Sequence, residues 1–292
     1  MAAVVCAAMT GSRGQKQIVT VECDILVAGG STAALATAIT AADAGPHLTV
    51  CLTEPTDGDY GGQMTSSGVS AIDFGPLNRH AANQPRSFRE LVAFLQSKGD
   101  PGCWVSTTCY NPRDMVTGWA RPRVAATPNL RVLNRTMVRG ATVGPDGRVV
   151  AVELVRRTPR PGVDEWDALL SEALEDWYSP ADSARFTKET MVATAAVVVD
   201  ATEFGDVLLT AGLEVGQGVE RPTELSPPGS DDQCGQAATL TFFMELLERP
   251  PATPDPAPAG SLAGGANFST SGCCCPGGGT CDYRSIWSYR RG

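Results

Sequence analysis

The 292-residue sequence has few charged residues, and they include no basic block. Charged side chains make up 19% of the chain and give a net charge of −9, so nucleic-acid phosphates and anionic membrane surfaces would repel it. No uninterrupted apolar run is long enough to cross a bilayer. We therefore expect a small-molecule substrate and neither a nucleic-acid nor a membrane partner, while the oligomeric state stays open.

Residues that bind metals are also scarce or poorly spaced. Histidine occurs only twice, and the ten cysteines include no CxxC pair. The three adjacent cysteines at 273–275 cannot by themselves close a tetrahedral cage. Cys23 and Cys51 lie in apolar runs, where cysteine usually behaves as a small hydrophobic residue. We predict no metal site and reduced thiols, as in a cytoplasmic protein.

Two segments lack the periodicity of regular structure. Residues 1–17 are expected to form a flexible N-terminus. Their basic residues follow the apolar stretch, which is the reverse of the order in a secretory signal, whereas an organelle transit peptide stays open. Residues 250–280 are rich in proline, glycine and serine and are expected to form a flexible loop.

One strand–turn–helix–strand unit stands out between residues 22 and 54. Ile25–Ala28 is a short apolar run typical of a strand buried on both faces, and Gly29-Gly30-Ser31 follows it as a turn. An alanine-rich helix is predicted over Thr32–Ala44, and a second buried strand over Leu48–Leu52. Together these segments form a βαβ unit, whose crossover is right-handed.

The glycine turn resembles the dinucleotide-binding pattern GxGxxG but departs from it twice. Gly29 and Gly30 are present, whereas Ser31 replaces the middle glycine and Ala34 the last. Alanine is compatible with the last position, because that residue sets only how closely the helix packs on the strand. Serine at the middle position either crowds a pyrophosphate or donates a hydrogen bond to it.

Glu54 follows the second predicted strand, where an acid accepts hydrogen bonds from a ribose diol in dinucleotide sites. The alternative is a surface acid that caps a loop. Taken together, the turn and this acid suit FAD and NAD equally.

The next residues resemble FAD-dependent oxidoreductases with the two-dinucleotide-binding, glutathione-reductase-like fold. Gly61-Gly62-Gln63-Met64 is similar to the glycine-rich loop that lies beneath the flavin in that family. Val198–Asp206 resembles the family's second FAD-facing strand and turn. Residues 102–113, 236–245 and 282–284 resemble further segments, in the same order along the chain.

This resemblance implies a set of cofactor contacts. The turn after the first strand would face the pyrophosphate, and the acid after the second strand would face the adenosine ribose. The glycine-rich loop would lie along the flavin, and a later strand would present its backbone to adenine. The implied FAD-binding residues are Gly29, Gly30, Ser31, Thr32, Ala33, Glu54, Gly61, Gly62, Gln63, Met64, Val138, Ala201 and Thr202. The resemblance identifies no catalytic residue; His80 is a candidate base, and Tyr110 and Arg113 are candidates for contact with substrate.

We predict an α/β fold with a Rossmann-like FAD-binding domain formed by residues 18–75 and 190–215. The strands of its parallel sheet are Ile25–Ala28, Leu48–Leu52 and Val197–Ala201. Residues 76–189 and 216–292 are expected to form an inserted substrate region of mixed α and β structure, which is incomplete. Within it, the spacing of apolar residues predicts an acidic amphipathic helix over Asp164–Trp177.

The function implied is that of an FAD-dependent oxidoreductase, in which flavin accepts a hydride from an unidentified small organic substrate. Two alternatives stay open. In an NAD-binding Rossmann dehydrogenase, Glu54 would favour NAD over NADP, because a carboxylate repels a ribose phosphate. The other alternative is a truncated, non-catalytic remnant. The resemblance implies this because full-length members of the family continue past the segment that corresponds to Gly292, with a turn and a helix that cover the flavin.

Overall fold

The computed structural model describes residues 18–74, 83–99, 106, 108–168 and 172–213. They form two compact units, one from residues 18–58 and 124–213 and the other from the described part of 59–123. Several segments singled out in the sequence lie outside the described residues: 1–17, His80, 236–245, 250–280, 273–275 and 282–284.

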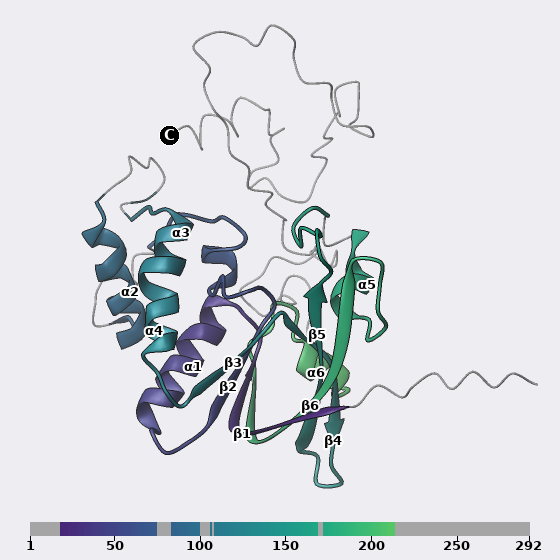
Figure 1. The fold of residues 1–292 in the computed structure, drawn as a ribbon. Helices are drawn as coiled ribbons and strands as arrows, with labels where there is room; N and C mark the ends of the chain where they lie inside the picture. The colour runs from purple at the N-terminus through teal and green to yellow at the C-terminus, as the bar shows by residue number, and fades with distance from the viewer. Residues whose placement is uncertain (1–17, 75–82, 100–105, 107, 169–171, 214–292) are drawn as a thin grey trace, which may run out of the picture. The chain divides into compact units, whose positions relative to one another are not determined.

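The first unit is built on a six-stranded sheet with the order β3-β2-β1-β6-β5-β4 (Figure 1). The strands are β1 (Val19–Ala28), β2 (Val50–Glu54), β3 (Leu130–Asn134), β4 (Thr136–Val143), β5 (Val149–Pro159) and β6 (Phe186–Asp200). The strands β3, β2, β1 and β6 pair in parallel, whereas β5 runs antiparallel to both of its neighbours. Ile25 lies opposite Val50 on one side and Val197 on the other, which confirms the predicted α/β fold and its parallel sheet.

The sheet is curled, because β3 and β4 occupy its opposite edges although only Arg135 separates them in the chain. Two consecutive Cα–Cα steps span at most about 7.6 Å, so the two edges meet at this residue. One buried core accordingly receives side chains from every strand, namely Leu26, Cys51, Leu133, Val138, Leu154 and Met191.

Helix α1 (Thr32–Ala44) packs on β1, β2 and β3. Its buried face consists mainly of small residues, which allow the helix to approach the sheet closely; these are Ala34, Leu35, Ala38, Ile39 and Ala42. Two short helices, α5 (Leu174–Tyr178) and α6 (Asp206–Thr210), pack near β4. Val207 of α6 joins the core inside the curled sheet.

The second unit contains the short 3₁₀ helix η1 (Gly62–Met64), α2 (Arg86–Ser97) and a longer helical stretch. That stretch consists of α3 (Pro112–Asp114), the π-helical η3 (Met115–Ala120) and the beginning of α4 (Arg121–Ala125). A small core forms where α2 packs against η3, with Leu91, Leu95, Tyr110 and Met115 among its buried residues.

The boundary between the units differs from the expected one. Residues 124–189 were expected in the substrate region, but β3, β4 and β5 belong to the same sheet as β1. The reason is that β6 is a single long strand, whose first part pairs with β5 while most of its length pairs with β1. An alternating apolar pattern predicts a strand without identifying the sheet that the strand joins.

The predicted helix over Asp164–Trp177 is wrong for most of its length. Among the described residues of this range, only those from Leu174 onward are α-helical, in α5, and residues 165–168 form turns and bends. Trp177 is buried whereas Trp166 is 50% exposed, so the two rings do not share one buried face. Tertiary contacts of this segment, described below, replace the helix.

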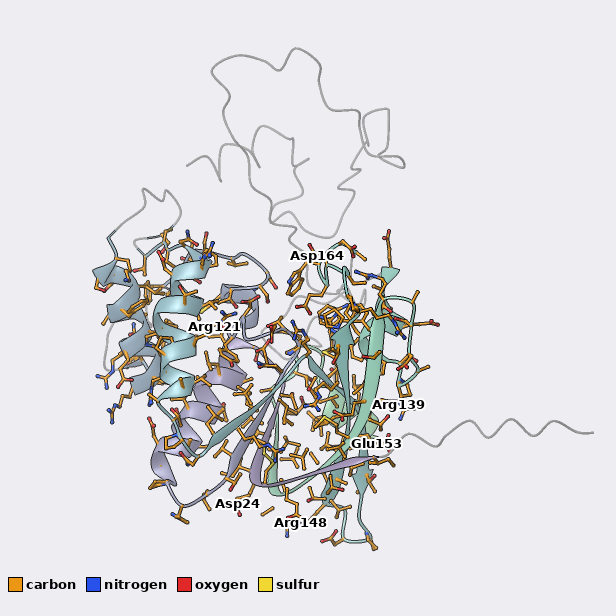
Figure 2. All side chains as sticks on the ribbon, in the orientation of Figure 1. Asp24, Arg121, Arg139, Arg148, Glu153 and Asp164 are labelled. Atoms are coloured by element: carbon orange, nitrogen blue, oxygen red, sulfur yellow. A yellow bond between two sulfur atoms is a disulfide. The ribbon has the colours of Figure 1, made fainter. Side chains whose placement is uncertain are left out.

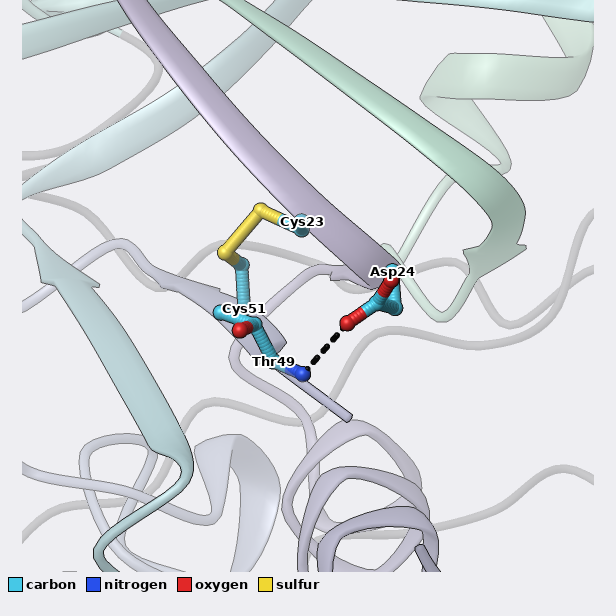
Figure 3. The surroundings of a disulfide bond; sticks show 4 residues. All are labelled: Cys23, Asp24, Thr49 and Cys51. Atoms are coloured by element: carbon cyan, nitrogen blue, oxygen red, sulfur yellow. Dashed lines mark hydrogen bonds between the residues drawn. A yellow bond between two sulfur atoms is a disulfide. The ribbon is translucent and has the colours of Figure 1, made fainter. Parts of the chain in front are cut away.

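Cys23 and Cys51 form a disulfide that joins β1 to β2, with their Cα atoms 5.9 Å apart (Figure 3). The prediction of reduced thiols is therefore wrong for this pair, and Cys109 is also disulfide-bonded. The backbone N–H of Thr49 donates to the Asp24 carboxylate over 2.7 Å and joins the same segments.

The cytoplasmic location stays a prediction, and a disulfide counts against it, because reducing compartments keep most thiols free. None of the helices in the described part of the chain combines the length and apolarity needed to cross a bilayer.

We expect removal of this disulfide to destabilise the first unit. The bond closes a loop with a sequence separation of 28, so the double variant Cys23→Ala/Cys51→Ala should lose about 3.5 kcal/mol of unfolding free energy. Denaturant unfolding in non-reducing buffer measures the loss. Alkylation of the denatured, unreduced wild type is the control, and labelling of Cys23 and Cys51 there would show that the bond is absent.

Candidate functional site

The carboxyl ends of β1 and β6 continue into two turns that touch each other. The backbone N–H of Ala201 donates to the Ala28 carbonyl over 2.8 Å. Gly29 has φ +117°, and a Cβ added there would lie 2.2 Å from the Ala201 carbonyl oxygen. Both the backbone conformation and the close approach therefore require glycine at this position.

The next glycine makes room for the end of β2. A Cβ added to Gly30 would lie 2.3 Å from Pro55 Cδ and 2.7 Å from Glu54 Oε2. The backbone N–H of Gly29 also donates to Thr53 Oγ1 over 2.7 Å, which fixes the turn from the β2 side. The glycine turn thus brings together the carboxyl ends of three adjacent parallel strands, where open α/β sheets bind their ligands.

Ser31, at the altered position of the glycine pattern, uses its hydroxyl within the protein. Its Oγ donates to the Ala201 carbonyl over 2.9 Å and accepts from the Ala34 N–H over 3.1 Å, so that it caps α1. A hydroxyl has one proton, so in this conformation Ser31 does not donate to a phosphate. Thr32 and Ala33 begin the helix, and its first turn contains no acidic residue. The positive end of the helix dipole therefore points toward the glycine turn that precedes it.

Glu54 is the last residue of β2 and is 2% exposed. Its Oε1 accepts hydrogen bonds from the backbone N–H of Thr56 over 2.9 Å and from Thr56 Oγ1 over 2.6 Å. The acid is therefore buried beside Gly30 and held by the loop that follows it, rather than capping an exposed loop. Its contact with a ribose stays a prediction.

Asp200 organises the turn after β6, a role that the sequence analysis missed. Its Oδ1 accepts from the N–H of Thr202 over 3.0 Å and from Thr202 Oγ1 over 2.8 Å, and its Oδ2 accepts from the Leu208 N–H over 2.9 Å. Thr202 Oγ1 in turn accepts from the Asp206 N–H over 2.7 Å. An aspartate two residues before a threonine is a signal for such a turn.

Two further titratable groups lie near this turn. Burial, followed by the charge of Asp200, raises the pKa of the Asp206 carboxyl above its usual range. Burial, followed by the charge of Asp206, raises the pKa of the Tyr178 hydroxyl. Both groups therefore favour their neutral forms more than exposed groups of the same type would.

Val138 lies on β4, opposite Leu154, and its side chain is in the core of the curled sheet. The pairing of β4 with β5 is irregular between Val138 and Gly140. Arg139 lies at this irregularity and forms an exposed ion pair of 2.7 Å with Glu153 of β5 (Figure 2). The backbone contact of Val138 with adenine stays a prediction.

The glycine-rich loop lies in the second unit. Gly61 and Gly62 have φ +114° and +51°, and a Cβ on Gly61 would lie 2.8 Å from Met115 Cε. The hydroxyl of Tyr110 is within hydrogen-bonding distance of the carbonyls of Met64 and Val69, at 3.1 and 3.0 Å.

Tyr110 is buried, and burial raises the pKa of its hydroxyl. The side chain supports the loop from within the protein, which corrects its suggested role as a substrate contact. Arg113, the other candidate for substrate contact, is exposed.

The predicted FAD-binding residues thus fall into separate groups. The structure brings together the residues of the first turn, the acid after β2 and the second turn, which are Gly29, Gly30, Ser31, Thr32, Ala33, Glu54, Ala201 and Thr202. Val138 belongs to the same unit but lies on a different strand of the sheet. Gly61, Gly62, Gln63 and Met64 are neighbours within the second unit.

Residues 24–163 match the sequence model of a family described as FAD dependent oxidoreductase. No curated protein matches the sequence. The L-proline dehydrogenase from P. horikoshii is 17% identical, with a TM-score of 0.33, and the match covers 64% of this chain and 24% of that one. The adenylylsulfate reductase from Archaeoglobus fulgidus is 15% identical, with a TM-score of 0.39, and the match covers 64% of this chain and 31% of that one. Thermovibrio ammonificans THI4 is 17% identical, with a TM-score of 0.40, and the match covers 68% of this chain and 66% of that one. The chain thus spans only part of the length of these proteins.

We expect Gly29→Ala to destabilise the first unit far more than Gly147→Ala. Both glycines have positive φ, but a Cβ at Gly147 meets nothing within 4 Å, whereas at Gly29 it meets Ala201. The loss of unfolding free energy should be about 1 kcal/mol at Gly147 and about 3 kcal/mol or more at Gly29. Denaturant titration of both variants measures the difference, and equal losses would show that the two turns do not touch.

Asp206 should make the stability of the fold depend on pH. Because its pKa is higher in the folded than in the unfolded state, the folded state holds the proton more tightly. Its contribution is most favourable below the ordinary pKa of aspartate and is lost as the pH rises through the raised, folded pKa. Asp206→Asn should flatten this decline when unfolding free energies are measured across the acidic range, and an unchanged slope would contradict the assignment.

Proposed function

Because this chain belongs, through residues 24–163, to the FAD-dependent oxidoreductase family, we propose that it binds FAD where β1, β2 and β6 end. We further propose that the flavin accepts a hydride from a small organic substrate. The observation that carries the proposal is the meeting of the glycine turn, Glu54 and the Ala201–Thr202 turn at the carboxyl ends of adjacent parallel strands.

The first turn of α1 suits a pyrophosphate. Its backbone amides carry the positive end of the helix dipole, and no acidic side chain lies within the turn. Ser31 contributes by capping the helix and binding the Ala201 carbonyl, and it offers no proton to the ligand in this conformation. The anion would therefore be bound by the amides that begin the helix, around Thr32 and Ala33.

Glu54 suits the ribose of the adenosine half. It is fixed by Thr56 beside Gly30, and a carboxylate accepts hydrogen bonds from a diol while repelling a ribose phosphate. Val138 would present its backbone to adenine. Gly61, Gly62, Gln63 and Met64 would contact the ribityl and flavin half, because their glycines permit close approach of the backbone to a planar ring system.

FAD, when bound, supplies a two-electron acceptor for the oxidation of an organic substrate. The described residues would contribute by binding and orienting its nucleotide half. We assign no general base. The NAD-binding alternative is less well supported, since the family that matches the chain is defined by FAD.

The first test is the visible absorbance spectrum of the purified chain after incubation with FAD and desalting. Retention of protein-bound flavin bands is expected, and parallel incubation with NAD should leave FAD binding unchanged. A chain that is folded by circular dichroism yet colourless would contradict the proposed cofactor site. Where flavin is retained, loss of its oxidised bands on anaerobic addition of small organic substrates would identify the hydride donor.

A further inference from the structure

Arg135 has a backbone conformation that favours glycine. Among the described residues it is the only non-glycine residue with positive φ, at +52°. An L side chain in this region costs conformational free energy that glycine would avoid. Residues held in such conformations often carry a function that requires the side chain.

The backbone alone does not require arginine at this position. Arg135 lies where the two edges of the curled sheet meet, and its N–H donates to the Thr56 carbonyl over 2.9 Å. Its own carbonyl accepts from the N–H of Arg157, on β5, over 2.9 Å. Glycine would make both hydrogen bonds without strain, so the reason for arginine lies in the guanidinium group.

That guanidinium joins two acidic side chains from different segments. Its Nη2 donates to Asp57 Oδ2 over 2.9 Å, in the loop after β2. Its Nε and Nη2 also donate to the two oxygens of Glu165, each over 3.3 Å, from the connection between β5 and β6. Glu165 is only 11% exposed and Arg135 27%, so solvent screens this pair less than an open surface pair.

Glu165 is itself held by a second, fully buried arginine. The guanidinium of Arg157 lies 3.4 Å from Glu165 Oε2 and 3.4 Å from the ring centroid of Trp177. Burial lowers the pKa of Arg157 to about 10, so the group is still charged at neutral pH. A charged group buried against aromatic rings needs its counter-charge, which fixes the position of Glu165.

The chain of contacts continues to Glu54. The same loop that Arg135 binds at the Thr56 carbonyl and at Asp57 supplies both hydrogen bonds to Glu54 Oε1. We propose that Arg135 is a positioning residue for the nucleotide half of the cofactor: its guanidinium, held by Glu165, fixes the loop over residues 55–57 and thereby the carboxylate of Glu54. This inference rests on the proposed function, because it assigns Glu54 to the adenosine ribose.

Arg135→Gly is the central variant, because glycine adopts the positive φ of this position without strain while the whole side chain, with its guanidinium, is removed. We expect it to raise the dissociation constants of FAD and ADP about tenfold, as measured by fluorescence titration of the full chain and by competition. Glu165→Gln should act in the same direction. Glu153→Gln removes a matched acid from an exposed Arg–Glu pair on the same sheet and should leave both constants unchanged.

A double-mutant cycle separates positioning from general stabilisation. If Arg135 acts through Glu54, then Arg135→Gly should have no further effect on FAD affinity in a Glu54→Gln background. Independent effects that multiply would overturn the inference, and so would unchanged FAD and ADP affinity in Arg135→Gly.

Amide hydrogen exchange of the ligand-free chain provides a readout that does not depend on FAD. Faster exchange confined to residues 54–57 is expected in Arg135→Gly. Unchanged exchange there would overturn the inference even if the wild type fails to bind FAD, an outcome that by itself would contradict only the proposed function.

Discussion

The structure of the first unit depends on the parallel pairing of β1 with β6. The pairing runs from Val19 opposite Met191 to Ala28 opposite Asp200, and it joins segments far apart in the sequence. It places the turn after β6 against the turn after β1, where Gly29 and Ala201 touch. It also brings β5 and β4 into the sheet, since β5 pairs with the first part of β6.

The curl of the sheet follows from the same connections. With β3 and β4 at opposite edges and one residue between them, the edges must converge at the carboxyl end of β3. Where the edges converge, Arg135 hydrogen-bonds both to the loop after β2 and to the connection before β6. The proposed nucleotide site therefore lies beside the point where the two edges of the sheet converge, and Glu54 is buried there.

The sequence predicts the parts of this arrangement that repeat locally. The buried strand over Ile25–Ala28, its glycine turn and the helix over Thr32–Ala44 follow from apolar runs and punctuating glycines, and the structure confirms them. What could not be predicted depends on partners distant in the chain. The disulfide of Cys23 requires the register of β1 against β2. The amphipathic pattern over Asp164–Trp177 predicts a helix, but residues 165–168 form turns and bends, and Glu165 there forms ion pairs with Arg135 and Arg157. The hydroxyl of Ser31 binds Ala201, a partner that local sequence does not reveal.

The β1–β6 pairing also determines when the unit can fold during synthesis. The first βαβ segment is translated long before Phe186–Asp200, so β1 has an unpaired edge until β6 leaves the ribosome. Such an edge is open to pairing with other chains. The bond between Cys23 and Cys51 joins residues that are both made early, and it can hold β1 to β2 during this interval. Formation of this disulfide before synthesis is complete would thus keep β1 paired with β2 and limit the pairing of β1 with other chains until β6 is available.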